Sequence, residues 1–537
     1  MTSQQSTPQW LDEAVFYQIY PQSFYDSNGD GIGDLPGIIE KLDYVRSLGV
    51  NAVWLNPCFD SPFRDAGYDV RDYRRVAPRY GANLDLKNLF EEARRRGIRV
   101  LLDLVPGHTS VEHPWFQSSC RHEKNEYSDW YIWTDSAWKW DVPGLRIVSG
   151  HAERDGAYVT NFFYFQPALN YGFARIDPNH PWQQPVDAPG PRRVREEIRN
   201  LMKFWLDQGA SGFRVDMSGW LVKSDPDYKA NIELWQEMRS WFDQEYPEAV
   251  LVAEWGRPAI AIEAGFHVDL MLPFGMPGYT SLLRKPNGQG PGSDRYGFSF
   301  FDSGGRGNIR EFLDDYTSHY EKTKERGLIA PNTGNHDTVP RLSEGRSWDD
   351  LEVVFIWLLS MPGTPFLYYG DEIGMRTIHG LPSKEGAYGR TGLRTPMQWS
   401  EGPNAGFSSA PSEALYLPVD KAPDRPTVAA QERDPASLLN RVRRLIALRK
   451  AHPALCATGG FEVVYAEAGK YPFVFKRTKG DQTLLVAVNP SARPVEVSLP
   501  LTVTAQPRTL YGLADALSTT GLLRLPGVSG GVYELEA

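Results

Sequence analysis

The chain has 537 residues, of which 41% are hydrophobic and 23% are charged, a balance typical of globular proteins. Its formal net charge of −10 argues against nucleic acid or an anionic membrane as a partner. The length exceeds that of one ordinary domain, so we expect a large unit with at least one accessory module. No apolar run approaches the roughly 18 residues that a membrane span needs.

Three cysteines, Cys58, Cys120 and Cys456, are scattered along the chain and form no disulfide framework or paired metal motif. Such usage favours a reducing compartment. The N-terminal residues MTSQQSTPQWLDEA lack the basic and apolar regions of a signal peptide. We therefore expect a soluble, cytoplasmic protein, whose oligomeric state the sequence leaves open.

Short apolar runs alternate with amphipathic stretches over most of the chain, which is typical of βα units and a parallel sheet. The expected strands are residues 14–20, 52–56, 100–105, 212–216, 250–254, 267–272, 328–333 and 365–369. The expected helices are residues 38–48, 86–96, 192–208, 230–245, 309–326 and 349–360. Eight such units predict an α/β fold, the (β/α)₈ or TIM barrel, whose active site lies at the C-terminal ends of its strands.

Two irregular stretches interrupt this alternation. An aromatic-rich insertion follows the third strand, and a Pro- and Gly-rich stretch over residues 374–434 follows the eighth. Loops of this length are usually functional. After a helix near 438–450, short alternating runs predict a small antiparallel β-module. The expected domains are a catalytic barrel (1–108 and 174–455), an inserted subdomain (109–173) and a C-terminal β-domain (456–537).

Acidic residues stand at the ends of several predicted strands. Asp103 lies in the third strand, Asp216 ends the fourth, Glu254 ends the fifth and Asp337 follows the seventh. A carboxylate at the end of an apolar strand is costly to bury without a purpose. One alone is usually a salt bridge or a cap, but four that converge on one barrel mouth predict a catalytic centre.

Two of these carboxylates suit the cleavage of a glycosidic bond. That reaction needs one group to protonate the leaving oxygen and another to meet the cationic carbon. Arg214 lies two residues before Asp216 and points to the same side of the strand, so it is expected to keep Asp216 ionised as the nucleophile. Glu254 follows an apolar run and precedes Trp255, a setting that raises the pKa of a carboxyl and suits a general acid.

The segments DLVPGH, GFRVD, VLVAE and NHD resemble, in order and on the expected strands, the four signatures of the α-amylase family (glycoside hydrolase family 13). The resemblance implies Asp216 as nucleophile, Glu254 as acid/base and Asp337 as a third carboxylate that binds the sugar's 2- and 3-hydroxyls. Further substrate-binding residues that it implies are His108, Arg214 and His336.

Other segments resemble the branch that contains oligo-1,6-glucosidase, trehalose synthase and sucrose isomerase. These are VFYQIYP, the triplet GYD at 67–69, and RTPMQW from Arg394. The resemblance implies that Tyr68 stacks on the terminal glucose, while Asp69 and Arg394 pair around its 4-hydroxyl. Such a pair would close the pocket beyond that sugar, so we expect exo-action on disaccharides and short oligosaccharides.

The segment DSNGDGIGD carries oxygen ligands at alternating positions, with glycines that allow a tight turn. The simplest interpretation of this segment is a solvent-exposed turn without a ligand. The family binds a structural cation in the same first barrel loop, which implies Ca²⁺, or Mg²⁺ in its place. The implied ligands are the side chains of Asp26, Asn28, Asp30 and Asp34 with the carbonyl of Ile32. No motif indicates an organic cofactor.

The leading hypothesis is a retaining α-glucosidase acting on a small α-glucoside. The alternative is a glucosyl-transferring isomerase or transglycosylase, in which a sugar rather than water intercepts the intermediate; a non-catalytic family-like binding protein is the third. Met217 and Ala168 depart from the patterns of the branch, so linkage preference stays open. Gly107 replaces the family's usual Asn, so we expect no calcium between the barrel and the insertion.

Overall fold

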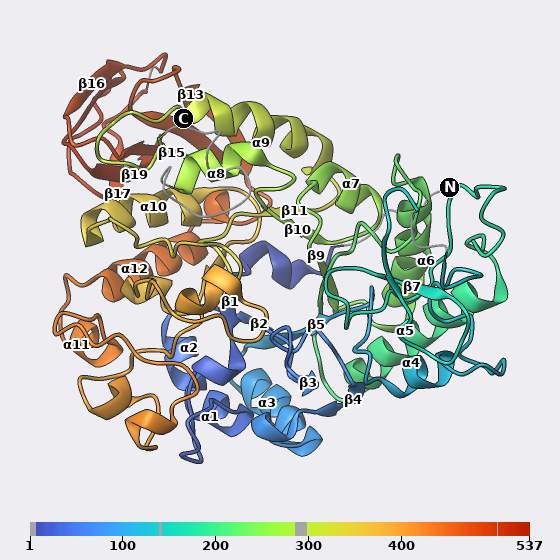
Figure 1. Cartoon of the computed structure of the whole chain (residues 1–537). Coiled ribbons are helices and arrows are strands. Elements are labelled where there is room, and N and C mark those ends of the chain that lie inside the picture. Colours follow the sequence, from blue (N-terminus) through green and yellow to red (C-terminus); the bar gives the residue numbers. More distant parts are fainter. Residues whose placement is uncertain (1–6, 139–141, 285–297, 502, 537) are drawn as a thin grey trace.

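The computed structural model describes residues 7–138, 142–284, 298–501 and 503–536. In these ranges eight parallel strands form one sheet, in the order β11-β10-β9-β8-β5-β2-β1-β12. Their bounds are β1 (Phe16–Ile19), β2 (Ala52–Leu55), β5 (Arg99–Leu104), β8 (Gly212–Val215), β9 (Val250–Ala253), β10 (Val268–Leu270), β11 (Leu328–Ala330) and β12 (Phe366–Tyr368). A parallel bridge between Asn332 and Phe366 joins the two end strands. The predicted barrel is confirmed (Figure 1).

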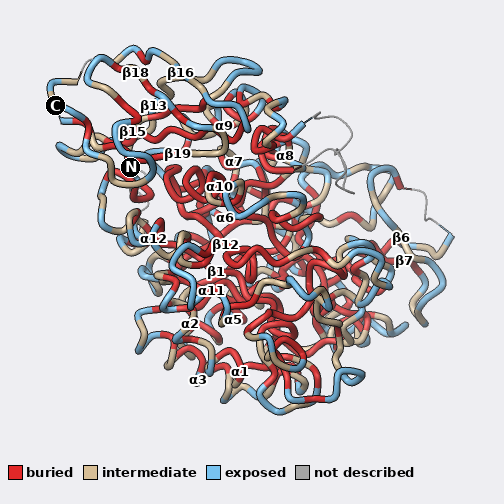
Figure 2. Tube along the Cα trace, turned by 90° about the vertical axis from the view of Figure 1, so that its left-hand side faces the viewer, coloured by how far each residue is buried: buried red, intermediate tan, exposed pale blue. Residues whose placement is uncertain are grey.

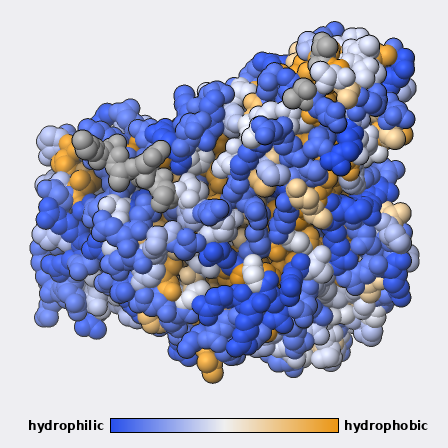
Figure 3. Space-filling view, turned by 180° about the vertical axis from the view of Figure 1, so that it is seen from behind, coloured by the Kyte–Doolittle hydropathy of each residue, from blue (hydrophilic) through white to orange (hydrophobic). Residues whose placement is uncertain are grey.

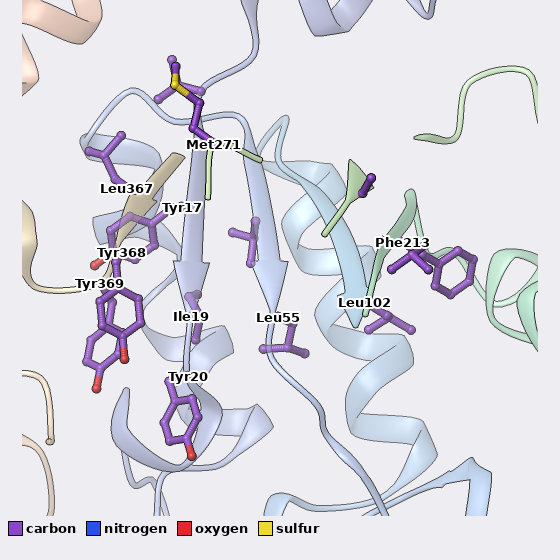
Figure 4. Close-up of a cluster of buried hydrophobic side chains, with 14 of the residues drawn as sticks. Tyr17, Ile19, Tyr20, Leu55, Leu102, Phe213, Met271, Leu367, Tyr368 and Tyr369 are labelled. Carbon is purple, nitrogen blue, oxygen red and sulfur yellow. The ribbon is translucent and has the colours of Figure 1, made fainter. Parts of the chain in front are cut away.

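Side-chain alternation along each strand separates two cores. One cluster, which includes Phe16, Trp54 and Val252, draws most of its members from the barrel strands and fills the barrel interior. The other includes helix residues together with the alternate strand positions, such as Tyr17 and Leu55. Figure 4 shows members of this second layer on successive strands. Every barrel strand is therefore buried on both faces, which explains why the strands read as continuous apolar runs.

Helices surround the barrel. Their bounds are α1 (Leu35–Glu40), α2 (Leu42–Ser47), α3 (Asn83–Arg95), α5 (Pro189–Asp207), α6 (Lys229–Glu245), α7 (Pro258–Glu263), α8 (Pro277–Leu283), α9 (Ile309–Thr323), α10 (Trp348–Ser360), α11 (Val428–Glu432) and α12 (Leu438–Ala451). The single helix expected at 38–48 is two short ones, divided at Lys41, where ψ is 3°. The first begins earlier than expected because Asp34 caps it and Pro36 occupies its first turn.

Small two-stranded sheets lie in the segments that follow β2 and β5, at the C-terminal side of the barrel. One pairs β3 (Phe59–Asp60) with β4 (Asp72–Val76) after β2. The insertion after β5 contains α4 (Pro114–Ser119) and a hairpin of β6 (Arg146–Ser149) and β7 (Ala157–Thr160). The insertion projects from one side of the barrel, in the teal part of Figure 1. The stretch after β12 is built from short 3₁₀ turns and α11, with no strand among its described residues.

The C-terminal module is antiparallel. Its main sheet has the order β13-β14-β15-β19-β17, and β16 pairs with β18 beside it. The bounds are β13 (Gly460–Tyr465), β14 (Phe473–Lys479), β15 (Gln482–Asn489), β16 (Val495–Ser498), β17 (Arg508–Tyr511), β18 (Leu522–Leu525) and β19 (Ser529–Leu535). A buried arginine of β14 binds it to the barrel: Arg477 donates to Ser360 O at the end of α10. The domain limits at 108/109, 173/174 and 455/456 remain our prediction.

Burial is densest where the barrel meets its helices, and the exposed segments lie at the periphery (Figure 2). The face seen in Figure 3 is mainly hydrophilic, with small separate apolar patches. Within the described ranges no helix has both the length and the apolar character that crossing a bilayer requires. Residues 1–6, which contributed to the interpretation of the N-terminus, lie outside the described residues.

Candidate active site

The strand register brings polar side chains into the barrel interior near its C-terminal end. Gln18 pairs with Trp54 across β1 and β2, and Asp103 pairs with Arg214 across β5 and β8. Because side chains two residues further along a strand point the same way, Asp216 lies one layer above Arg214. Glu254 holds the equivalent position after β9, since Arg214 pairs with Val252. The parallel sheet thus brings carboxylates from separate segments to one place.

Arg214 is the centre of this arrangement. Its Nη1 lies 2.8 Å from Asp103 Oδ1 and 3.0 Å from Asp216 Oδ1, and its Nη2 lies 2.5 Å from Glu254 Oε1. The guanidinium is 1% exposed. The second oxygen of Glu254 accepts from the backbone N–H of Met217 at 3.1 Å. One buried cation therefore holds three carboxylates, and it brings Asp216 and Glu254 together.

The protonation of this cluster differs from the sequence-based expectation, in which Arg214 alone keeps Asp216 ionised. Burial and the neighbouring Glu254 carboxylate raise the pKa of Asp216, and Arg214 only partly opposes them because it is shared. The Asp216 carboxyl is therefore harder to ionise than it would be beside Arg214 alone.

His336 is held as a neutral ring. The amides of Gln18 and Asn56 donate to its Nδ1 at 3.0 and 3.2 Å, so the proton resides on Nε2. Nε2 lies 2.9 Å from the hydroxyl of Tyr68, which donates to Asp103 at 2.9 Å. Burial lowers the pKa of His336 to about 3. The ring of Tyr68 stacks on the imidazole, with centroids 5.5 Å apart.

Asp337 completes the cluster from the segment after β11. Its Oδ1 accepts from Arg394 Nη2 at 2.8 Å and from Arg390 Nη1 at 2.5 Å, and its Oδ2 lies 3.4 Å from His336 Nε2. Burial favours the neutral acid, but these cationic and imidazole neighbours outweigh it and lower the pKa of Asp337. Arg390 was not among the predicted site residues, since it lies in the irregular stretch after β12.

The expected pair of Asp69 and Arg394 is wrong. Asp69 is fully buried and accepts from Ser61 Oγ and from the backbone N–H groups of Arg64 and Asp65. The carboxylate that interacts electrostatically with Arg394 and Asp337 is that of Asp65, four residues earlier. Asp65 accepts from Gln166 Nε2 at 2.7 Å, and burial raises its pKa to about 6. The hydrogen bonds that Asp69 accepts instead stabilise the loop that carries Asp65.

His108 lies at the junction of barrel and insertion, fully buried, with Nε2 3.2 Å from the carbonyl of Tyr68. Burial lowers its pKa to about 3. Asn161 from the insertion donates to Gly107 O at 2.7 Å, and a Cβ at Gly107 would lie only 3.1 Å from that amide nitrogen. Lys223 Nζ lies 3.0 Å from Asn161 Oδ1 and from Trp220 O. An ammonium group thus binds the two parts together here.

The predicted cation loop is a network of oxygen-to-amide hydrogen bonds. Asp26 accepts from Gly29 N and Gly31 N, while Asn28 accepts from Asp30 N and Asp30 accepts from Ile32 N. Asp34 caps α1 and accepts from Ser27. Each carboxylate oxygen has two lone pairs, so these hydrogen bonds leave lone pairs free to bind a hard cation. Among the described residues no group of three or more His, Cys, Asp or Glu side chains is placed to hold a metal. Calcium in this loop stays a prediction.

A sequence model of the protein family described as the catalytic domain of alpha amylase matches residues 18–458 of this chain. The trehalose synthase/amylase TreS of Mycolicibacterium smegmatis is 35% identical over 494 residues, which cover 84% of this chain and 78% of the relative. An oligo-1,6-glucosidase of Parageobacillus thermoglucosidasius is 32% identical over 557 residues, covering 91% and 92%.

Solved structures agree with this relationship. An inactive double mutant of MutB in complex with isomaltulose superposes with a TM-score of 0.81 at 26% identity, covering 99% of this chain and 100% of that one. The signatures, the barrel, the carboxylates around Arg214 and these matches lead to one conclusion. The chain belongs to the α-amylase family of carbohydrate-active enzymes.

Proposed function

We propose that the protein is a retaining, exo-acting α-glucosidase that hydrolyses disaccharides and short oligosaccharides. The observation that carries this proposal is the contact of Asp216 and Glu254 with the two Nη atoms of one guanidinium, at 3.0 and 2.5 Å. Retaining glycosidases need two carboxyl groups about 5 Å apart, whereas inverting enzymes separate them further to admit a water molecule. Two carboxylates that share one arginine suit the closer spacing.

In the proposed reaction Asp216 Oδ attacks the anomeric carbon, while Glu254 gives its proton to the leaving oxygen. The glycosidic C–O bond breaks, and a glucosyl ester forms on Asp216. Glu254, now ionised, takes a proton from water, whose oxygen attacks the same carbon. The ester bond to Asp216 breaks, glucose is released, and Asp216 is again a carboxylate while Glu254 is again protonated. The binding roles are proposed for Tyr68, His108, Arg214, His336, Asp337 and Arg394, with Asp65 in the place expected for Asp69.

Exo-action is supported by the way two remote segments meet beside this cluster. Phe163 of the insertion stacks with Tyr388 of the stretch after β12, with centroids 6.2 Å apart. Arg79 and Glu385 join the same stretch to the barrel with a 2.8 Å ion pair. Two segments that touch beside the carboxylate cluster would close one end of the substrate pocket. Such a pocket admits the end of a sugar chain, but not a polymer that passes through.

A glucosyl-transferring isomerase is the second candidate. The catalytic residues would be identical, and walls that close over the site could also retain the released sugar until it attacks the intermediate. TreS of Mycolicibacterium smegmatis, at 35% identity, is named as a trehalose synthase, whereas the relative from Parageobacillus thermoglucosidasius is named as a glucosidase. A non-catalytic role is less well supported, because the chain keeps the carboxylates of Asp216, Glu254 and Asp337.

The test is to incubate the enzyme separately with maltose, isomaltose, sucrose and trehalose and to identify the products by chromatography. We expect free glucose as the main product, released first as the α-anomer, which proton NMR detects before mutarotation. A rearranged disaccharide with little free glucose would establish the isomerase instead. The Asp216→Asn variant, which lacks the proposed nucleophile, is the control for contaminating activity.

A further inference from the structure

A buried carboxylate lies behind Glu254, on the face of the barrel wall that points away from the sugar. Asp269 is the middle residue of β10, where it pairs with Ala253, the residue before Glu254. Its sequence neighbours Val268 and Leu270 belong to the cluster that fills the barrel interior, so the side chain of Asp269 faces the surrounding helices. It is fully buried there. Asp269 therefore has no direct access to a substrate at the mouth of the barrel.

Asp269 binds the turn that follows Glu254. One carboxylate oxygen, Oδ1, accepts from the backbone N–H of Trp255 at 3.1 Å and from that of Gly256 at 3.2 Å. Among the described residues the other oxygen, Oδ2, has no hydrogen-bond partner. Burial raises the pKa of Asp269, whereas the backbone N–H groups of the turn lower it. A carboxyl group buried at this cost indicates that the turn needs its acceptor.

The two peptide groups that flank the Cα of Glu254 are each fixed by a hydrogen bond. The N–H of Glu254 donates to Val215 O at 3.1 Å, at the end of β8. The N–H of Trp255, which belongs to the next peptide group, donates to Asp269. Because peptide groups are planar, two fixed planes determine the φ and ψ of the residue between them. They therefore set the direction in which the side chain of Glu254 leaves the backbone.

Close packing surrounds the same turn. Gly256 has a φ angle of 68°, in the left-handed region that favours glycine. A Cβ added at Gly275 would lie 2.0 Å from Gly256 O, and one added at Gly219 would lie 2.4 Å from the indole nitrogen of Trp255. Trp255 and Gly256 are both buried. Without Asp269 their N–H groups would be unsatisfied donors, and the peptide group after Glu254 would reorient to recover a partner.

We propose that Asp269 is a positioning residue for Glu254: by accepting from Trp255 and Gly256 it orients the peptide group after Glu254 and so directs the carboxyl group toward the leaving oxygen. The inference rests on the proposed function, because it assigns proton transfer to Glu254. General acid catalysis contributes about 10²–10⁴-fold and requires hydrogen-bond reach to the reacting oxygen, so a small misplacement loses part of that factor. Only a leaving group that needs a proton should show the loss.

The experiment measures kcat/KM of Asp269→Ala, Asp269→Ser and Asp269→Asn for two substrates that differ in their need for an acid. One is the disaccharide that the wild type cleaves fastest, followed by its disappearance, whose leaving oxygen must be protonated. The other is α-glucosyl fluoride, followed by fluoride release, whose leaving group departs as the anion.

We expect kcat/KM of the Ala and Ser variants to fall about ten- to a hundredfold for the disaccharide, but less than about threefold for the fluoride. The side chain of Ser ends one bond short of Oδ1, so it cannot serve both N–H groups. Asn keeps an oxygen acceptor in that place, and its kcat/KM should stay within about threefold of wild type for both substrates.

The matched control is Asp12→Ala. The Asp12 carboxylate likewise accepts from a backbone N–H, that of Thr458 at 2.9 Å, and it also pairs with Lys479 Nζ at 2.5 Å. It precedes β1, at the end of the barrel opposite the carboxylate cluster. This variant should lose stability in thermal melts, while its kcat/KM stays within about twofold of wild type for both substrates.

An equal fall for both substrates in the Ala and Ser variants would overturn the inference, because a general distortion of the site does not depend on the leaving group. Wild-type rates in both variants, a leaving-group effect in Asp12→Ala, or failure of both variants to fold would also overturn it. Formation of the glucosyl-enzyme precedes its transfer to water or to a sugar, so an isomerase would give the same pattern. A wild type that cleaves neither substrate would instead refute the proposed function, and the inference with it.

Discussion

Replacing Asp216 by Asn removes one charge from the carboxylate cluster around Arg214 with almost no change of shape. Asp216 is 6% exposed, and the Arg214 guanidinium that it contacts also serves Asp103 and Glu254. Near a protein surface a pair of unit charges 4 Å apart is worth about 4 kcal/mol, for attraction and repulsion alike. The attraction of Asp216 to Arg214 is therefore offset by its repulsion from Glu254, and the cost of burial remains.

We accordingly expect Asp216→Asn to stabilise the folded protein at pH 7 by about 1–2 kcal/mol, as removal of strained active-site groups commonly does. An unfolding entropy of roughly 1.1 kcal/mol/K, from about 2.1 cal/mol/K for each of the 537 residues, converts this into a rise in Tm of about 1–2 °C. Burial and Glu254 raise the folded-state pKa of Asp216, so its destabilising effect disappears below the unfolded pKa. The difference in Tm should therefore shrink as the pH is lowered from 7 toward 4.

The same variant should lose activity by a factor on the order of 10⁴–10⁶, the scale for loss of a nucleophile. Thermal melts followed by circular dichroism give the Tm, and 4-nitrophenol release gives the rate. Asp314→Asn, on the exposed surface of α9, is the control for an ordinary loss of charge. Residual activity above about 1%, or a Tm below that of wild type at pH 7, would refute the reasoning.

Two further predictions concern binding and stability. Burial raises the pKa of Asp65 to about 6, so the KM of the wild type should fall as the pH rises through 6 and this carboxylate ionises. Asp65→Asn should abolish that pH dependence and raise KM about ten- to a hundredfold. If the variant keeps the KM profile of the wild type, Asp65 does not bind the sugar. Asp26→Ala should lower stability by about 1–3 kcal/mol, since the N–H groups of Gly29 and Gly31 and the hydroxyl of Ser408 lose their acceptor. If the loop of Asp26 binds calcium, EDTA should lower the Tm of wild type and added Ca²⁺ restore it, with Asp26→Ala insensitive to both; a wild-type Tm that ignores EDTA would contradict the metal.

The regular elements could be predicted because their signals are local. Each apolar run of the barrel became a strand within one to three residues of the expected bounds, since burial on both faces demands continuous apolar sequence. The C-terminal β-module could be predicted, but not each of its strands, because short strands such as β17 and β18 have mixed exposure and carry little periodicity. The break at Lys41 was missed as well, since apolar spacing continues across it.

What the sequence by itself determined is the barrel and the convergence of Asp216 and Glu254, because parallel strands bring their C-terminal ends to one edge whatever the loops do. Only the tertiary structure decided between Asp65 and Asp69, two carboxylates four residues apart in one loop. It also decided that Arg390 approaches Asp337, and that one guanidinium serves three carboxylates. These contacts join segments far apart in the chain through close packing and electrostatics, which no local pattern of residues encodes.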